Sequence, residues 1–275
     1  MSMAVTISVV QFAPVLKNIE ANVALMCEYI ATATSDLIVF PELALSGYSF
    51  ASPEEARAYA LSRNSEAINI LAASAKAAQR AIIFGYIEED GEVLYNSAML
   101  IDAQGIQQLH YRKVHLFYME KKVFAAGNLG FPVASINCNG QEVTVGIQIC
   151  YDWRFPEATR SLALQGAEII AIPSNIVTTT GMLDITLRTR AFENKVILAF
   201  ADRVGSEILA TDPEEKLRFR GESMIVNYNG EVLARLSSEE STIAVATIEP
   251  KKTRNKDINY LNNILSDRNK NQYLT

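Results

Sequence analysis

An apolar, β-branched run in this sequence ends at a cysteine, and a helix pattern begins a few residues later. Residues 143–149 have the composition of a buried strand, and residues 156–165 contain helix formers that end at Gly166, a residue suited to a helix C-terminus. Cys150 therefore lies where a buried strand stops and the chain turns toward a helix. Ligands bind at the carboxyl ends of strands in open α/β sheets, and a thiol on such a turn can be held outward as a nucleophile. Cys150 can equally be a small buried hydrophobe, the commoner role of a free cysteine.

The same order of residue types occurs in both halves of the chain. Residues 36–43 and 168–175 each consist of an acid, four apolar residues, a proline and a loop with polar side chains. A helix pattern precedes each segment, which is typical of a divergent pair of βαβ units. Glu42 then lies at the carboxyl end of a buried strand, where it is either a solvated loop acid or the base of a site.

The rest of the chain continues the alternation of strands and helices and ends in a polar tail. Further strands are expected at residues 5–10, 81–87, 93–100, 131–137, 196–201, 224–227, 231–235 and 242–248, and helices at 19–30, 53–79 with a break near 64, and 186–194. The tail, residues 251–275, carries only scattered apolar side chains and cannot bury itself. We expect it to pack on a partner subunit.

Length and composition favour one α/β domain over residues 1–275. The chain is 49% apolar and 20% charged, and no Pro/Gly/Ser-rich linker divides it. The net charge of −6, without a run of basic residues before the tail, makes nucleic acid and anionic membranes poor partners. No stretch approaches the roughly 18 apolar residues of a membrane span. The N-terminus runs directly into a strand, so we expect a cytoplasmic, reducing location.

Several chemistries are excluded by the residues that the sequence lacks. The only histidines, His110 and His115, lie in one segment, and each is more typical of a structural residue than of a catalyst. The three cysteines have no CxxC spacing, and no H-E-x-x-H, Walker A or G-x-G-x-x-G pattern is present. No metal, nucleotide or other cofactor is therefore expected. A free thiol with a pKa of about 8.5 needs a base or a nearby cation, so a nucleophilic Cys150 would be served by Glu42 and Lys113.

Three motifs around these residues resemble those of one enzyme superfamily. The segments F-P-E-L-A-L-S-G-Y with Glu42, Y-R-K-V-H-L-F with Lys113, and G-I-Q-I-C-Y-D-W-R-F-P-E with Cys150 closely resemble the glutamate, lysine and cysteine motifs of the nitrilase superfamily of carbon-nitrogen hydrolases. The resemblance extends over nearly the whole chain, and it is to the small single-domain amidases and archaeal-type nitrilases. It implies a four-layer α-β-β-α sandwich that assembles as a homodimer or higher homo-oligomer, without a cofactor.

The resemblance also implies roles for single residues. Glu42 would act as general base, Cys150 as nucleophile, and Lys113 with the backbone N–H of Tyr151 as donors to the oxyanion. Glu120 matches a second family glutamate that supports the lysine or positions the substrate, although it could instead be a surface acid paired with Lys121 or Lys122.

Other residues are candidates to line a substrate pocket, and each could instead be packing: Tyr48, Tyr118, Trp153 and Asn175. The chain departs from the family pattern at residues 125–127, where Ala-Ala-Gly replaces a proline-bearing turn. Residues 177–181 are rich in threonine and match no diagnostic pattern, so they leave the substrate-facing loops unassigned.

The expected reaction is hydrolysis of a small linear amide to carboxylate and ammonia through a cysteine thioester. Nitrile hydrolysis is a close alternative, because the motifs do not separate the two substrates. A third is an N-carbamoyl amidohydrolase, which would need a cation for the substrate carboxylate, with Arg154, Arg188 and Arg203 available. The alternative of another class is a scaffold or binding protein that has kept the fold without turnover.

Overall fold

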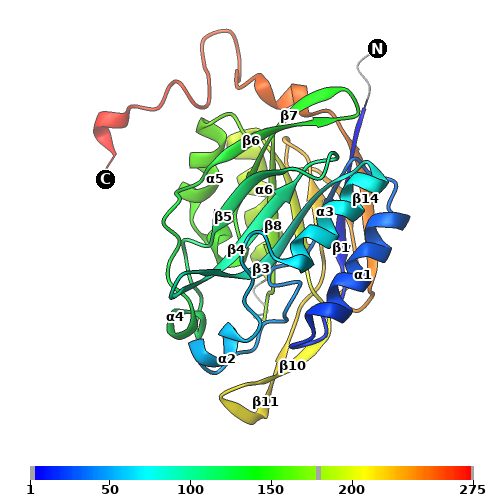
Figure 1. Ribbon diagram of the computed structural model, residues 1–275. Coiled ribbons are helices and arrows are strands. Elements are labelled where there is room, and N and C mark those ends of the chain that lie inside the picture. The colour runs from blue at the N-terminus through cyan, green and yellow to red at the C-terminus, as the bar shows by residue number, and fades with distance from the viewer. Residues whose placement is uncertain (1–3, 178–180, 274–275) are drawn as a thin grey trace.

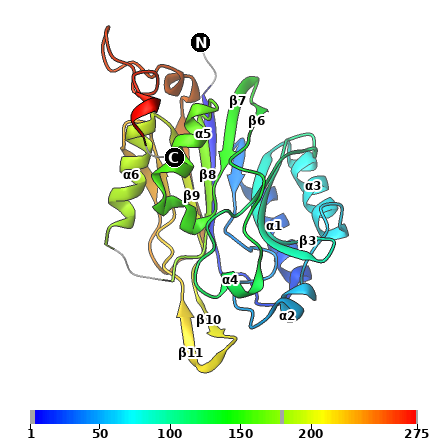
Figure 2. The same ribbon diagram turned by 90° about the vertical axis from the view of Figure 1, so that its left-hand side faces the viewer.

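Two six-stranded β-sheets lie face to face, with helices on their outer faces (Figure 1, Figure 2). This computed structural model describes residues 4–177 and 181–273. The first sheet has the order β14 Thr242–Ile248, β1 Val5–Gln11, β2 Leu37–Val39, β3 Ala81–Asp90, β4 Val93–Ile101 and β5 Gln107–Arg112. The second has the order β13 Val232–Arg235, β12 Met224–Val226, β9 Ile197–Asp202, β8 Ile169–Ser174, β7 Gln141–Ile147 and β6 Val133–Cys138.

Four longer helices form the outer layers, which completes the predicted α-β-β-α sandwich. They are α1 Ile19–Thr32 and α3 Glu66–Ala78 on the first sheet, and α5 Pro156–Leu164 and α6 Leu183–Asn194 on the second (Figure 2). The shorter elements are α2 Pro53–Arg57, α4 Glu120–Val123 and the 3₁₀ helices η1 Cys150–Arg154, η2 Pro250–Arg254 and η3 Lys270–Gln272. Helix α1 begins where the Asn18 side chain accepts the N–H of Ala21 at 3.0 Å, and it buries Val23, Met26 and Ile30 at helical spacing.

The two halves of the chain have the same topology, as the repeated sequence pattern predicted. Strand β2 is the middle of a parallel trio with β1 and β3, and β8 is the middle of a parallel trio with β7 and β9. Each trio is extended on both sides by antiparallel strands, β14 and β4 in one sheet and β6 and β12 in the other. The carboxyl ends of the central strands therefore carry corresponding loops.

Alternation along the strands divides the core into layers. In β2, Leu37 and Val39 belong to the cluster that includes the inward side chains of both sheets, whereas Ile38 packs with α1 and α3. Strand β3 repeats this division with Ile83 and Ile82. Both faces of these strands are buried, which explains why they read as continuous apolar runs.

A hairpin that the sequence did not predict extends beyond the sandwich at the lower end of Figure 1. It consists of β10 Ser206–Leu209 and β11 Asp212–Arg218, which pair only with each other. Strand β11 is acidic and largely exposed, so its composition resembles a loop rather than a strand. The helical region at residues 53–79 is broken as expected near residue 64, and Ser65 is the residue at the N-terminus of α3.

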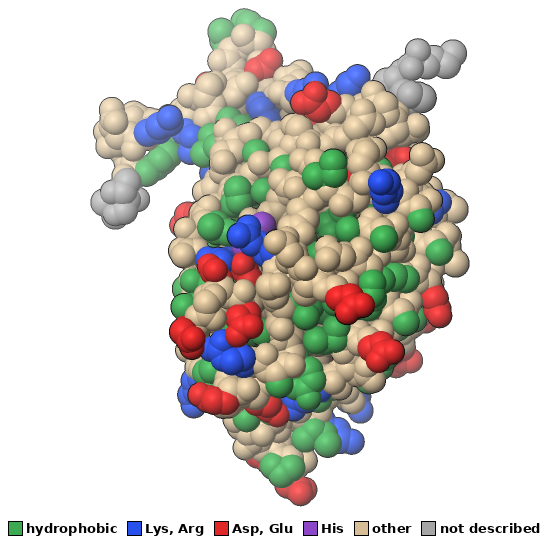
Figure 3. Space-filling view, viewed as in Figure 1, with side chains coloured by type: hydrophobic (Ala, Val, Ile, Leu, Met, Phe, Trp, Pro, Cys, Tyr) green, Lys and Arg blue, Asp and Glu red, His purple; other side chains and the backbone are tan. Residues whose placement is uncertain are grey.

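The molecular surface carries charges of both signs, and the C-terminal tail extends beyond the sandwich. Acidic and basic side chains are interspersed on the face in Figure 3. Residues 255–273 leave the sandwich at the end opposite the β10–β11 hairpin, and Tyr260 and Leu261 are 93% and 73% exposed. Within the described ranges, every helix is too short or too polar to cross a membrane.

Candidate active site

The loop after β2 places Glu42 inside the molecule. The Glu42 side chain is fully buried, and the next residue, Leu43, has a φ of 46°. Such a conformation is uncommon outside glycine. The loop lies so close to β3 that a Cβ at Gly85 would be 2.4 Å from the Leu43 nitrogen. A glycine at this position of β3 therefore permits the path that carries Glu42 inward.

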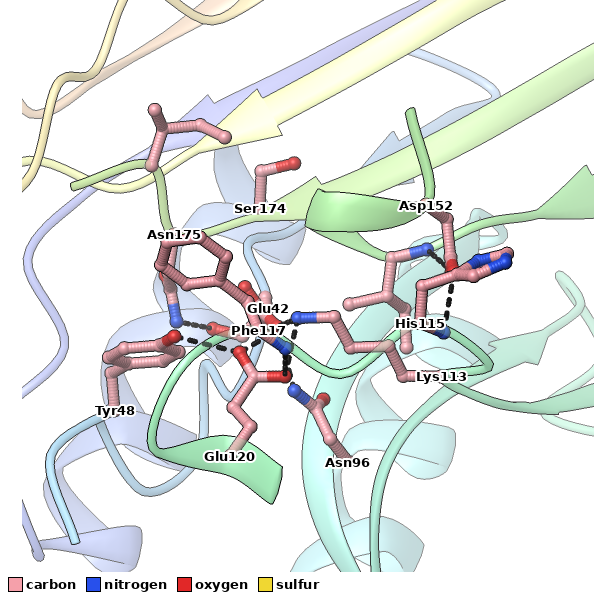
Figure 4. A network of polar contacts seen from close by, with 12 residues as sticks. Glu42, Tyr48, Asn96, Lys113, His115, Phe117, Glu120, Asp152, Ser174 and Asn175 are labelled. Carbon is pink, nitrogen blue, oxygen red and sulfur yellow. Dashed lines mark hydrogen bonds and ion pairs between the residues drawn. The ribbon is translucent and has the colours of Figure 1, made fainter. Parts of the chain in front are cut away.

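Lys113, which follows β5, lies between two carboxylates. Its Nζ is 2.6 Å from Oε1 of Glu42 and 2.8 Å from both carboxylate oxygens of Glu120, and the lysine is fully buried (Figure 4). Asn96 on β4 also donates to Oε1 of Glu42 at 2.7 Å. Glu42 Oε2 is buried and has no hydrogen-bond partner among the described residues. One oxygen of the acid is thus held in place, while the other is free to accept a proton.

Glu120 is the first residue of α4 and is 4% exposed, so it is not a surface acid. Its carboxylate accepts the Tyr48 hydroxyl at 2.7 Å and the backbone N–H of Phe117 at 3.2 Å (Figure 4). Its partners are Lys113 and Tyr48 rather than the neighbouring lysines at 121 and 122. No pattern in the residues predicted the hydrogen bond between Tyr48 and Glu120.

Cys150 begins η1 two residues beyond the end of β7, with a φ of 41° and 5% exposure. Asp152 fixes this turn because its carboxylate accepts the N–H of Ile149 at 2.8 Å and the hydroxyl of Tyr111 at 2.6 Å. The same carboxylate accepts the backbone N–H of His115 at 3.0 Å and contacts its Nδ1 at 2.7 Å. His115 is therefore a hydrogen-bonded structural residue, as the sequence analysis expected. Asp152 is a positioning residue that the sequence analysis missed.

Burial and charge determine the protonation of the three groups. Desolvation raises the pKa of Glu42 from 4.5 to about 7; Lys113 opposes this shift and the charge on Glu120 adds to it. Desolvation, together with Glu42, also raises the pKa of the Cys150 thiol well above its ordinary value. Desolvation lowers the pKa of Lys113, but the two carboxylates outweigh it and the net shift is upward. At neutral pH the site therefore holds a neutral thiol, an ammonium ion and a carboxyl group that is much less ionised than an ordinary glutamate.

Two small cavities adjoin these residues, each with about 30 Å³ of free volume. The first is lined by Tyr48, Tyr118 and Glu120 together with apolar side chains of α4 and the β10–β11 hairpin. The second is lined by Cys150, Trp153 and Asn175. All four predicted pocket residues therefore border a cavity, and Asn175 also donates its Nδ2 to the Glu42 carbonyl at 2.9 Å (Figure 4). Part of the loop at residues 177–181 lies outside the described residues.

The three arginines considered as cation sites differ in their positions. Arg154 stacks on Trp153 with its Cζ 4.8 Å from the ring centroid, and it lines the second cavity. Arg188 on α6 donates to the Gly230 carbonyl at 2.9 Å and borders a different cavity. Arg203 is 1% exposed and paired with a carboxylate. Of the three, Arg154 alone borders a cavity that reaches Cys150.

In the described residues, no group of three or more His, Cys, Asp or Glu side chains is arranged to hold a metal ion.

Known proteins share this sequence and fold. The family described as carbon-nitrogen hydrolase matches residues 6–256. A nitrilase from Pyrococcus abyssi is 40% identical over 240 residues, which cover 87% of this chain and 86% of the nitrilase. An N-carbamoylputrescine amidase from Arabidopsis thaliana is 30% identical over 267 residues, which cover 89% of this chain and 86% of the amidase.

Two structures of an amidase from Nesterenkonia sp. have the same fold, each with 25% sequence identity and a TM-score of 0.77. Each match covers 96% of this chain, and the matches cover 93% and 96% of the two amidase chains. One of these shows acrylamide added at the amidase's active-site cysteine. With the family match spanning nearly the whole length, the chain belongs to the carbon-nitrogen hydrolases.

Proposed function

We propose that this enzyme hydrolyses a small linear amide to a carboxylate and ammonia through a thioester on Cys150. The observation that supports this most directly is the buried Lys113 ammonium held between Glu42 and Glu120, with one oxygen of Glu42 unbonded. Among the described residues both adjoining cavities are narrow, which favours a short substrate. The acrylamide adduct on the Nesterenkonia amidase supports a cysteine at the centre of the reaction in a related fold.

In the first step Glu42 accepts the thiol proton as Cys150 sulfur attacks the amide carbon. The raised pKa of the thiol means that the resting sulfur is protonated, so a base is required. A base with a pKa of about 7 combines a substantial ionised fraction with a strong tendency to take the proton. The free oxygen of Glu42 serves this purpose without breaking its contacts to Lys113 and Asn96.

The negative charge that develops on the amide oxygen needs donors that are already in place. The Lys113 ammonium supplies one, and the backbone N–H of Tyr151 supplies another. Tyr151 is the second residue of η1, where helix N–H groups have no partner within the helix. In a dry site each donor contributes about 3 to 4 kcal/mol of transition-state stabilisation. Glu42 then returns its proton to the leaving ammonia and activates the water that hydrolyses the thioester.

The substrate class is tested by measuring ammonia release from short aliphatic amides, nitriles and N-carbamoyl compounds. We expect the amides to have the highest kcat/KM. Nitriles are the second candidate, because attack of the thiol on a nitrile carbon would give a thioimidate and the Pyrococcus relative is named a nitrilase. N-carbamoyl acids would need Arg154 to bind their carboxylate, because Arg203 is buried and paired. Turnover of nitriles alone would show that the amide assignment is wrong.

A thiol-labelling experiment separates an enzyme from a scaffold of the same fold. Cys27 is partly exposed, and burial raises the pKa of Cys138 to about 12. With iodoacetamide, itself a small amide, we expect Cys150 to react first and Glu42→Gln to slow the reaction. Equal reactivity of the three thiols, measured by intact mass and peptide mapping, would favour the scaffold.

We further propose that the protein is a cytoplasmic homodimer with the tail packed on its partner. The exposed Tyr260 and Leu261 support an intermolecular contact, and the three free cysteines are compatible with a reducing compartment. Light scattering of the full chain tests the assembly, with Tyr260→Ser and Leu261→Ser expected to shift it toward the monomer.

A further inference from the structure

An ion pair between Arg203 and Glu207 lies buried where the β10–β11 hairpin meets the sandwich. The two residues are 1% and 6% exposed, and the guanidinium contacts the carboxylate directly. Burying two charges is costly unless further hydrogen bonds satisfy them, so such a pair needs a structural or functional reason. The reaction outlined above assigns it no role.

The Glu207 carboxylate holds the segment that carries Tyr48. It accepts the backbone N–H of Tyr48 at 3.0 Å and that of Ser49 at 2.9 Å. The segment approaches so closely that a Cβ at Gly47, which has a φ of +78°, would be 2.8 Å from Glu207 Oε1. The hairpin makes a further hydrogen bond to this segment, because the N–H of Ala210 donates to the Ser49 hydroxyl at 2.7 Å. Glu207 thus sets the backbone position of this segment.

The ring of Tyr48 is fixed by the same ion pair through Phe219. The Arg203 Cζ lies 3.9 Å from the Phe219 ring centroid, and the Phe219 ring meets the Tyr48 ring edge-on at 6.0 Å. The Tyr48 hydroxyl then donates to Glu120 at 2.7 Å, and Glu120 contacts Lys113 at 2.8 Å (Figure 4). A continuous series of contacts therefore runs from the ion pair to the ammonium.

We propose that Arg203 and Glu207 are positioning residues for the reaction, acting through Tyr48 on the Glu120–Lys113 pair. This role depends on the proposed function, because it concerns the same lysine. If Tyr48 shifts, Glu120 loses a hydrogen bond and holds Lys113 less firmly. Lys113 then moves toward Glu42, which makes Glu42 a weaker base and displaces the oxyanion donor. The hairpin thereby influences catalysis without touching the reacting atoms.

Glu207→Gln tests this role because it removes the charge and one acceptor while keeping the side-chain size. We expect kcat for the best amide substrate to fall by about 10- to 100-fold, the usual effect of misplacing a catalytic group, with KM within about threefold. The pH midpoint of kcat/KM should also move to lower pH, because Lys113 would pair more closely with Glu42. Glu207→Asp, which keeps the charge but shortens the reach, should show a smaller loss in the same direction.

Glu168→Gln is the matched control. Glu168 is also a buried carboxylate, 2% exposed, that accepts a backbone N–H (Thr144, 2.8 Å) and pairs with an arginine (Arg254, 2.7 Å). It lies just before β8, at the opposite end of the strand from Asn175. We expect this variant to lose stability similarly but to keep kcat within about twofold of wild type. A folded Glu207→Gln or Glu207→Asp with the kcat and pH midpoint of this control would overturn the proposal.

A double-mutant cycle with Tyr48→Phe shows whether Glu207 acts through Tyr48. If it does, the loss in the double variant should be close to the larger of the single losses, because both break one series of contacts. Losses that multiply would show that Glu207 acts by another route and would contradict the proposal. If Glu207→Gln does not fold, the same cycle is measured with Glu207→Asp.

The rate of Cys150 alkylation by iodoacetamide separates failure of this proposal from failure of the proposed function. Alkylation requires no turnover, but it depends on Glu42 as base and Lys113 as neighbouring cation. Wild-type protein that turns over no amide would count against the proposed function alone. A Glu207→Gln variant alkylated about tenfold more slowly than Glu168→Gln would still support the positioning role, and equal rates would overturn it.

Discussion

The raised pKa of Glu42 predicts a specific pH dependence of catalysis. The carboxyl is moved from its ordinary value of 4.5 to about 7, chiefly by burial. Since the ionised form is the base, kcat/KM should rise with pH and level off above the midpoint. At pH 5 only about 1% of an acid with this pKa is ionised, so kcat/KM should be about 90-fold lower than at pH 8. An acid with the ordinary pKa would be about three-quarters ionised at pH 5, and the loss would be less than about twofold.

The assay is ammonia release from a short aliphatic amide between pH 5 and 9. Circular dichroism and a return to pH 8 should show that the protein stays folded and that the loss at low pH is reversible. Glu42→Gln should lower kcat/KM by about 10²- to 10⁴-fold and abolish the midpoint near pH 7. A midpoint near 4.5 in the wild type, or one near 7 that persists in the variant, would refute the assignment of Glu42 as the base.

Two further substitutions test the surroundings of Glu42. Lys113→Met leaves the carboxylates of Glu42 and Glu120 without their shared cation. The pH midpoint of kcat/KM should therefore move upward by at least about one unit, and kcat should fall by about 10²- to 10³-fold. An unchanged midpoint would contradict the role of Lys113 as the cation beside Glu42. Gly85→Ala should cost about 1–3 kcal/mol in the free energy of unfolding and lower kcat at least about 100-fold, because the new Cβ meets the loop backbone at 2.4 Å. Gly91→Ala is the control, because Gly91 has a φ of +60° but an added Cβ would have no neighbouring atom within 4 Å. It should lower the free energy of unfolding by about 1–2 kcal/mol without changing kcat.

Much of the fold follows from local patterns that depend on neighbouring residues alone. The run at residues 143–149 carries Val and Ile at every second position, and the structure makes its first part the buried strand β7, which ends at Ile147, three positions before Cys150. The hairpin turn at Asn139 and Gly140 has a φ of 50° and 77° at these residues, as Asn-Gly turns require. The β10–β11 hairpin was missed because Asp212–Arg218 lacks the alternating apolar pattern of a half-buried strand.

The sequence by itself determined the order of strands, helices and turns and the residue types available for chemistry, because burial patterns and turn residues act over a few positions. The four-layer sandwich was expected from the resemblance to the family. The tertiary structure decided their environment. Glu42 is 71 residues from Lys113 in the sequence, whereas Glu120 is only seven residues from it. Folding places both carboxylates within 2.8 Å of the Lys113 Nζ and away from water. Desolvation then raises the pKa of Glu42 and of Cys150, a property that no residue type has on its own. The contacts of Glu207 with the Tyr48 segment are likewise visible only in the folded chain, because hydrogen bonds to backbone N–H groups leave no mark in the residue types.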